Sequence, residues 1–310
     1  MEKNGSITAK NLTFAQWVEI MLSDDFRLLD VSKCFPTDSI AEEFIDRAQQ
    51  FSVKKVRSLL RRFLINSRTR PIDQNTLEAY HVLDSPGLHK ERFFETEFYR
   101  RLASENYDAW EGITWVLDLL PTSPKMAIEV IKSYISAHIM LLHDYELIGL
   151  EDAMTIVRAR FINHQQPRDI FLDLHPREFE ILIDALYDKM GYDTTLTPYR
   201  NDGGKDVIAI SSELGKEEKL LIECKRYEPD VGPDIIRALN GVVSSDKATK
   251  GVLVTSSDFT PEARNFAKEN GVELINHSNL TRLLNTYFGT NWPSFVDRII
   301  LTRKFETSED

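Results

Sequence analysis

Cysteine is scarce in this sequence. Only two cysteines occur among the 310 residues, Cys34 and Cys224, and neither has a partner at Cys-x-x-Cys spacing. The sequence therefore indicates neither a disulfide framework nor a zinc site built from thiolates. We expect both side chains to be small buried hydrophobes in a reducing compartment.

Long apolar runs are also lacking. No stretch approaches the roughly 18 consecutive apolar residues of a membrane span, and the first residues, MEKNGSITAKN, contain no apolar run that resembles a signal peptide. Hydrophobic residues nevertheless make up 42% of the chain and charged residues 28%, a composition typical of globular domains that bury a core. We therefore expect a cytoplasmic protein that has no membrane partner.

Positive charge is in deficit. The formal net charge is -11, and residues 171–290 contain 14 basic and 20 acidic side chains. This balance argues against a protein that coats nucleic acid by bulk electrostatics. It does not exclude a nuclease, because a metal site itself requires clustered carboxylates and its cations reverse the local field. Affinity for DNA would then come from a local basic groove, from the metal or from a partner.

The first half of the chain has the periodicity of helices. Apolar residues recur every three or four positions over 14–21 and 53–64. A third helix is expected to begin at Pro124 and to run through Ile139, and a fourth is expected from about Leu150 to Phe161. The pattern predicts an all-α domain over residues 1–165, which would recognise a target, bind a protein partner or self-associate.

A polar segment over 163–168, which includes a proline, precedes a change of character. Beyond it, helical and strand-like patterns alternate. In chain order we expect a helix over 176–190, strands at 194–197, 206–210 and 220–225, a helix over 233–243, a strand at 251–255, a helix from 261 and a strand at 272–275. This αβββαβ order predicts an α/β sandwich around a mixed sheet over residues 170–290, followed by a C-terminal tail over 291–310.

Charged residues interrupt two of the apolar strand segments. Asp206 begins the second expected strand, and Glu223 and Lys225 lie near the end of the third. Because side chains alternate along a strand, Glu223 and Lys225 project to the same face, whereas Ile222 and Cys224 face the opposite layer. If the two strands form a hairpin, Asp206 approaches Glu223, and two carboxylates and an ammonium group converge at one sheet edge.

These residue types suit phosphodiester hydrolysis. Mg²⁺ prefers one or two carboxylates together with waters and substrate oxygens, and it can bridge a phosphate oxygen and an attacking water. Asp206 and Glu223 are ligands of this kind. Lys225 would orient the water or help to deprotonate it, and would offset the charge that grows on the phosphate in the transition state.

Three neighbouring features are open to more than one interpretation. Glu180, one turn into the preceding helix, could supply another carboxylate to the site. Gly203 and Gly204 would let the backbone approach a phosphate chain without a side-chain collision, although an ordinary flexible turn explains the pair equally well. Arg226 fits either a phosphate contact or an exposed salt bridge.

At these residues the sequence resembles the Mrr-type branch of the PD-(D/E)xK restriction endonuclease superfamily. The resemblance covers roughly residues 171–285. Its ordered segments are Pro176-Arg-Glu-Phe-Glu180, Met190-Gly-Tyr192, Asp202-Gly-Gly-Lys-Asp206-Val, Ile222-Glu-Cys-Lys-Arg-Tyr227, Gly251-Val-Leu-Val-Thr255 and Phe259-Thr-Pro-Glu-Ala-Arg264. A lone Glu-x-Lys triplet is weak evidence, but this ordered series is specific.

The resemblance implies a restriction-endonuclease-like fold and roles for individual residues. Asp206 corresponds to the motif aspartate, Glu223 and Lys225 to the (D/E)xK pair, and Glu180 to a helix acid often found in this branch. The backbone carbonyl of Cys224 is counted with the three carboxylates as a metal ligand. Many Mrr-like proteins carry glutamine at the position of Glu223, and the glutamate here strengthens the expectation of activity.

The resemblance also implies that the domain cleaves DNA with Mg²⁺, for which Mn²⁺ is expected to substitute. Some members of the family recognise modified bases or act in defence against foreign DNA. Where a family aspartate often follows the last strand, this chain has Asn276, which we interpret as peripheral. The winged-helix reader typical of the family is not evident, so the resemblance implies no target specificity.

Three functions compete at this point. The leading hypothesis is a metal-dependent DNA endonuclease whose helical half recognises a target or controls the catalytic half. The second is a catalytically silent nucleic-acid-binding module with the same fold. The third is an assembly subunit whose helical half binds other proteins.

Overall fold

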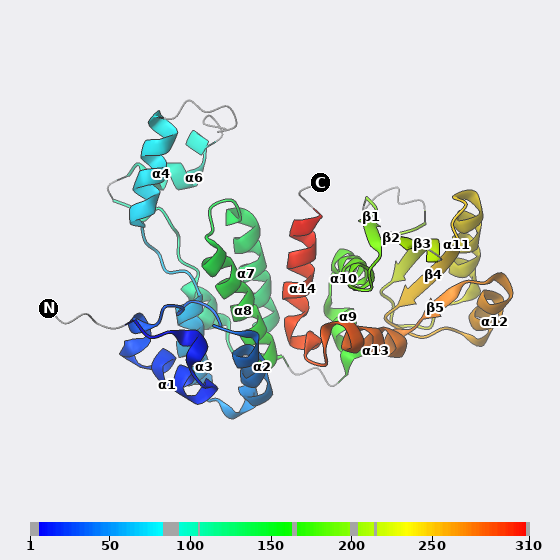
Figure 1. The fold of residues 1–310 in the computed structure, drawn as a ribbon, viewed down its shortest axis with the longest axis horizontal. Helices are drawn as coiled ribbons and strands as arrows, with labels where there is room; N and C mark the ends of the chain where they lie inside the picture. The colour runs from blue at the N-terminus through cyan, green and yellow to red at the C-terminus, as the bar shows by residue number, and fades with distance from the viewer. Residues whose placement is uncertain are drawn as a thin grey trace. The chain divides into compact units, whose positions relative to one another are not determined.

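The computed structural model describes residues 6–82, 93–104, 106–162, 166–198, 204–213 and 216–307. The chain divides into two compact units, Met1–Ile162 and Asn163–Asp310 (Figure 1). Within the described ranges, no helix combines the length and the apolar character that crossing a membrane requires.

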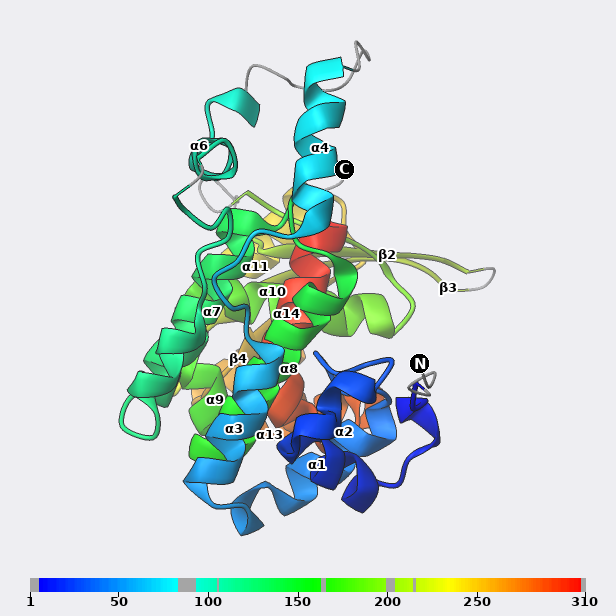
Figure 2. The same ribbon diagram turned by 90° about the vertical axis from the view of Figure 1, so that its left-hand side faces the viewer.

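The N-terminal unit is built from helices, which confirms the predicted class of this half. Its α-helices are α1 (Phe14–Leu22), α2 (Asp38–Arg47), α3 (Val53–Phe63), α4 (Pro71–Val82), α6 (Glu97–Leu102), α7 (Pro124–His138) and α8 (Asp144–Phe161). Short 3-10 helices lie at Ala9–Asn11, Asp24–Leu28, Ala48–Gln50 and Thr114–Leu119. Helices α7 and α8 pack side by side, as Figure 2 shows.

Helix α8 is the centre of this unit, and it is longer than expected. It begins at Asp144 rather than near Leu150, because His143 and Glu146 form a reciprocal capping box at its first turn. Every residue from Gly149 to Arg158 is buried. A helix that is covered on all sides carries no clear polar face, so periodicity alone does not locate its start.

Aromatic side chains fill the core between α1, α3 and the segment before α2. The ring of Phe35 lies 5.3 Å from the ring of Trp17 and 5.3 Å from that of Phe63. A second, smaller cluster gathers around Trp110, whose ring lies 5.4 Å from that of Phe98 in an edge-on arrangement. Both arrangements are those that aromatic pairs favour in protein interiors.

The C-terminal unit contains a five-stranded mixed sheet. Its elements are α9 (Pro167–Asp173), α10 (Pro176–Lys189), β1 (Asp193–Leu196), β2 (Val207–Glu213), β3 (Lys216–Lys225), α11 (Pro233–Ser245), β4 (Lys250–Thr255), α12 (Pro261–Asn270), β5 (Glu273–Ile275), α13 (His277–Phe288) and α14 (Trp292–Glu306). The strand order is β1-β2-β3-β4-β5, antiparallel from β1 to β3 and parallel from β3 to β5. The predicted αβββαβ order is confirmed.

The hairpin between β2 and β3 is longer than the sequence suggests. The polar segment 211–219, which lies between the two expected strands, largely continues both of them, with Ser211 opposite Glu218. Figure 2 shows the two strands running together. The Glu218 carboxylate also accepts a hydrogen bond of 2.6 Å from the hydroxyl of Tyr192, the residue that precedes β1. Cross-strand pairing therefore overrides the turn-like composition of this segment.

Helices cover both faces of the sheet (Figure 1). One face packs against α10, α13 and α14 and includes Ile222 and Cys224 of β3. The opposite face packs against α11 and α12 and includes Leu221. The alternation predicted for β3 is thus confirmed, and both Cys34 and Cys224 are buried, as expected.

Residues 292–306, expected as part of a tail, form helix α14, which packs against α10. Trp292 is fully buried and stacks on Phe171 of α9 at 5.6 Å between ring centroids. Arg303 reaches the fully buried carboxylate of Asp184 in α10 at 2.5 Å. The segment resembles a tail in sequence because α14 buries only part of its length, namely Trp292, Val296, Asp297, Ile300 and Leu301.

Candidate active site

Asp206 lies immediately before β2, at the point where β2 and β3 separate. Its backbone N–H donates to the carbonyl of Ile222 at 2.8 Å. Its Oδ2 accepts a hydrogen bond of 2.6 Å from the backbone N–H of Cys224. The carboxylate is therefore fixed against the end of β3 and is buried, with 7% of the residue exposed.

The surroundings of Asp206 raise the pKa of its carboxyl from 3.8 to about 6. Burial is the largest cause, and the hydrogen bond from Cys224 opposes it. The negative charges of Glu180 and Glu223 raise this pKa further, whereas Lys225 lowers it. The four charged groups that the sequence analysis singles out thus share one electrostatic environment.

Glu223 and Lys225 face the same side of β3, as alternation predicts. The Lys225 Nζ lies 2.7 Å from Oε1 of Glu223, and both side chains are largely buried. Burial lowers the pKa of Lys225, but the hydrogen bond and charge of Glu223 and the charge of Asp206 outweigh it, so the pKa is raised above 10.5. Lys225 therefore carries a full positive charge at neutral pH.

The second oxygen of Glu223 is the least satisfied atom of this group. Its Oε2 is buried and has no hydrogen-bond partner in the structure. Gly204 lies beside it: a Cβ added to this glycine would lie 3.8 Å from Oε2 and 3.3 Å from Val242. Gly204 has φ of +79°, in the left-handed region that favours glycine. Its predicted partner Gly203 lies outside the described residues.

Glu180 of α10 lies close enough to act on Asp206 but is already paired. Its Oε2 lies 2.7 Å from Nη1 of Arg177, and Nη2 of the same arginine donates to the carbonyl of Thr197 at 2.8 Å. The Thr197 hydroxyl in turn donates to the backbone carbonyl of Asp206 at 3.0 Å. This chain of contacts connects the helix acid to the motif aspartate.

Sequence reasoning missed Arg177. The signal that could have found it is its position three residues before Glu180 on a helix, where the two side chains are neighbours.

Arg226 is half-buried and binds a backbone carbonyl, whereas the sequence analysis expected a phosphate contact or an exposed salt bridge. Its Nη1 donates to the carbonyl of Leu172 at 2.8 Å, so the guanidinium joins the end of β3 to α9. The structure gives its phosphate contact no direct support.

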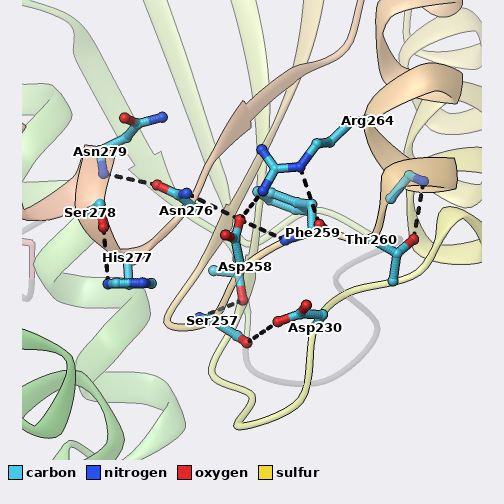
Figure 3. Close-up of polar contacts among 12 residues, drawn as sticks. Asp230, Ser257, Asp258, Phe259, Thr260, Arg264, Asn276, His277, Ser278 and Asn279 are labelled. Carbon is cyan, nitrogen blue, oxygen red and sulfur yellow. Dashed lines mark hydrogen bonds and ion pairs between the residues drawn. The ribbon is translucent and has the colours of Figure 1, made fainter.

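A polar cluster follows β4 and β5 at the end of the sheet where the parallel strand β3 also ends (Figure 3). The Asp258 carboxylate accepts from the Asn276 amide at 3.1 Å and from the N–H of Phe259 at 2.8 Å, and forms an ion pair with Arg264. Burial opposes ionisation of Asp258, yet these donors lower its pKa. Asn276 also caps α13 by accepting from the N–H of Asn279 at 2.9 Å. The cluster therefore fixes loops.

The end of β3 is attached to that cluster through its neighbour β4. The carbonyl of Lys225 accepts from the Thr255 hydroxyl at 2.8 Å and from the N–H of Ser256 at 3.1 Å. The Ser256 hydroxyl donates to the carbonyl of Tyr227 at 2.9 Å. Since the backbone of Lys225 is held in this way, the direction of its side chain is set by the rigid sheet.

The donor atoms of the site suit one class of metal ion better than others. Among the described residues, no group of three or more His, Cys, Asp or Glu side chains is arranged to hold a metal. Asp206 and Glu223 offer two carboxylates, one of them with a buried oxygen that lacks a partner. This set fits Mg²⁺, which takes one or two carboxylates and completes its shell with water, and it does not fit a structural zinc site.

The C-terminal unit is similar in sequence to known proteins. Residues 171–284 match the family model of the Mrr catalytic domain, described as a restriction endonuclease. A segment of 119 residues is 31% identical to the type IV methyl-directed restriction enzyme EcoKMrr of Escherichia coli (strain K12), covering 36% of this chain and 39% of that protein. A segment of 89 residues is 29% identical to the uncharacterized protein y4cE of Sinorhizobium fredii (strain NBRC 101917 / NGR234), covering 28% and 23% respectively.

Two solved structures are similar over part of the chain. The DNA modification-dependent restriction endonuclease AspBHI has a TM-score of 0.38 at 23% identity, over 45% of this chain and 39% of that one. The MspJI restriction endonuclease in complex with a 27-mer oligonucleotide has a TM-score of 0.35 at 20% identity, over 50% and 35%.

Residues 171–284 of the C-terminal unit are similar to the Mrr-type catalytic domain of restriction endonucleases, which confirms the resemblance predicted from the sequence. The alignments span about two fifths or less of the curated relatives, so the family assignment applies to this unit and leaves the helical unit outside it.

Proposed function

We propose that the C-terminal unit hydrolyses phosphodiester bonds in DNA with Mg²⁺ and acts in restriction of foreign DNA. The observation that carries this proposal is the buried, unpartnered Oε2 of Glu223, which lies beside Gly204 and next to the Asp206 and Lys225 side chains. A buried carboxylate oxygen without a donor is costly. A divalent cation would compensate for that cost.

Asp206 and Glu223 would hold the ion. The Cys224 carbonyl is suited to join them, because the N–H and C=O groups of one strand residue point to the same edge, and the N–H of Cys224 points at Asp206. Glu180 would reach the site only after its pairing with Arg177 changes, or through water. When bound, the ion would polarise the phosphate and supply an activated water.

Lys225 would stabilise negative charge. Its raised pKa keeps the ammonium protonated at neutral pH, so it is better suited to orient the attacking water and to offset charge on the phosphate than to remove a proton. Its Nζ is held 2.7 Å from Glu223, which places the cation beside the oxygen that would bind the ion.

Gly204 would let the DNA backbone come near. A side chain at this position would lie against the unpartnered oxygen of Glu223, so glycine keeps the approach to that atom open. Because one curated relative is a methyl-directed enzyme, methylated DNA is a substrate class worth testing. The helical unit would recognise a target, a protein partner or a second copy of the chain.

Plasmid cleavage tests the proposal. Wild-type protein should cut supercoiled plasmid in Mg²⁺ or Mn²⁺ and should be inactive in EDTA, with methylated and unmethylated plasmid assayed in parallel. Lys225→Ala should reduce the rate by at least about a hundredfold. Lys250→Ala is the matched control, because Lys250 also lies on a strand and pairs with a glutamate, Glu273, at 2.5 Å.

Equal cleavage by wild type and Lys225→Ala would refute catalysis at this site. Binding of the same DNA in a gel shift, with no cleavage under any of these conditions, would instead support the silent binding module.

A further inference from the structure

A hollow of about 370 Å³ opens on the N-terminal unit, and the proposed nuclease site does not use it. Three segments that are distant in sequence line it: residues 30–33, the pair Arg68 and Arg70, and the start of α8 from His143 to Glu146. All of them belong to the same unit.

Three cations converge on one carboxylate at the base of this hollow. Glu146 is 3% exposed, and its Oε1 lies 3.0 Å from both Lys33 Nζ and Arg68 Nη2. Its Oε2 lies 2.8 Å from Arg70 Nη1. The other lining carboxylate, Asp30, accepts from the backbone N–H of Ala9 at 2.8 Å. A lysine has three donors and an arginine five, so the three contacts with Glu146 occupy only part of the donors on these side chains.

Several of these donors are buried without directed hydrogen bonds. They are Nε of Arg68 and Nε and Nη2 of Arg70, whose side chain is 8% exposed and whose Nη1 is held by the ion pair with Glu146. Trp110 covers one face of that guanidinium, at 3.8 Å from the ring centroid. Burial is the main cause that lowers the pKa of Arg70, and it outweighs the nearby carboxylates. Buried donors of this kind normally have an acceptor.

We propose that this hollow binds a nucleotide-sized phosphate monoester. A phosphate group presents three terminal oxygens, which match two guanidinium forks and an ammonium better than a second carboxylate would. The start of α8 adds the positive end of an 18-residue helix.

The hollow has room for more than phosphate. Tyr145, which is 62% exposed, lines it together with His143. An exposed aromatic ring next to a phosphate site is suited to stack on a planar base, a contact that serves every base because each has a π-face. The ligand would therefore be a mononucleotide held by its phosphate, in the unit that lies outside the nuclease domain.

Calorimetric titration of the full chain, without divalent cations and at constant ionic strength, tests this proposal. The probes are inorganic phosphate, the four ribonucleoside 5′-monophosphates and adenosine. At least one nucleotide should bind more tightly than phosphate, and adenosine should not bind. Tyr145→Ala should weaken nucleotide binding and leave phosphate binding unchanged.

Variants of the cations locate the site. Arg68→Gln and Lys33→Gln should each weaken nucleotide binding by roughly tenfold, because each removes one charge-assisted contact. These two side chains are 41% and 39% exposed, so the variants should fold even if Arg70→Gln does not. Arg57→Gln is the matched control: Arg57 is 36% exposed and pairs with Asp118 at 3.1 Å, away from the hollow.

Two results would overturn the proposal. One is that none of the four nucleotides binds at millimolar concentration, or that phosphate binds as tightly as all of them. The other is that Arg57→Gln weakens binding as much as Arg68→Gln does, which would mean that the nucleotide binds by general charge attraction.

Discussion

Asp206→Asn should stabilise the metal-free protein while abolishing cleavage. Burial and two neighbouring carboxylates raise the pKa of Asp206 from 3.8 to about 6 in the folded chain. In the unfolded chain this pKa returns to its ordinary value, so the folded state holds the proton more tightly. The difference corresponds to roughly 3 kcal/mol at full effect.

The sign of this effect sets its pH window. A folded pKa above the unfolded one gives stability that is fully present below about 3.8 and is lost as pH rises through about 6. Asparagine mimics the protonated form and can still accept from the N–H of Cys224. The variant should therefore be more stable than wild type by up to about 3 kcal/mol at pH 7.5, and this advantage should disappear near pH 4.

Urea unfolding in EDTA at several pH values measures the difference. Asp258→Asn is the control of opposite sign, because the pKa of Asp258 is lowered by its donors and the charge contributes stability above its ordinary pKa. Asp258→Asn should be less stable than wild type at pH 7.5. If Asp206→Asn is equally stable or less stable at pH 7.5, with no dependence on pH, the account of a strained carboxylate at the site is wrong.

Three further predictions concern the surroundings of the site. Gly204→Val should cost about 1–2 kcal/mol and slow cleavage, whereas Gly191→Val, also at positive φ but with open space around it, should affect only stability in parallel urea melts. Arg177→Gln should leave the negative charge of Glu180 without its partner. Because that charge raises the pKa of Asp206, the rise of the cleavage pH profile should move to higher pH, and an unchanged profile would contradict this. Arg303→Met should cost about 3–5 kcal/mol by leaving a buried carboxylate unpaired, and a thermal melt within 2 °C of wild type would contradict it.

The sequence is informative about the site because the site lies on strands. Side-chain alternation alone places Glu223 and Lys225 on one face, and the structure has them 2.7 Å apart. The hairpin that brings Asp206 to the end of β3 also follows from the strand pattern, although its register, with Val207 opposite Ile222, is visible only in the structure.

Contacts between elements distant in sequence could not be predicted in the same way. The ion pair of Arg303 with Asp184 joins residues 119 positions apart, and no local pattern indicates it, so α14 reads as a tail. Arg226 reads as an exposed cation because its partner is a backbone carbonyl, that of Leu172, which carries no sequence signal. The convergence of Lys33, Arg68 and Arg70 on Glu146 arises from three separate segments for the same reason.

The central claim is that Asp206 and Glu223 share one divalent ion. Anomalous diffraction from a crystal soaked in Mn²⁺ tests it most directly. The account predicts one strong anomalous peak in contact with both carboxylates and near the Cys224 carbonyl, and its loss in a Glu223→Gln crystal. A soaked wild-type crystal with no peak between the two carboxylates, or with the same peak in Glu223→Gln, would contradict the account.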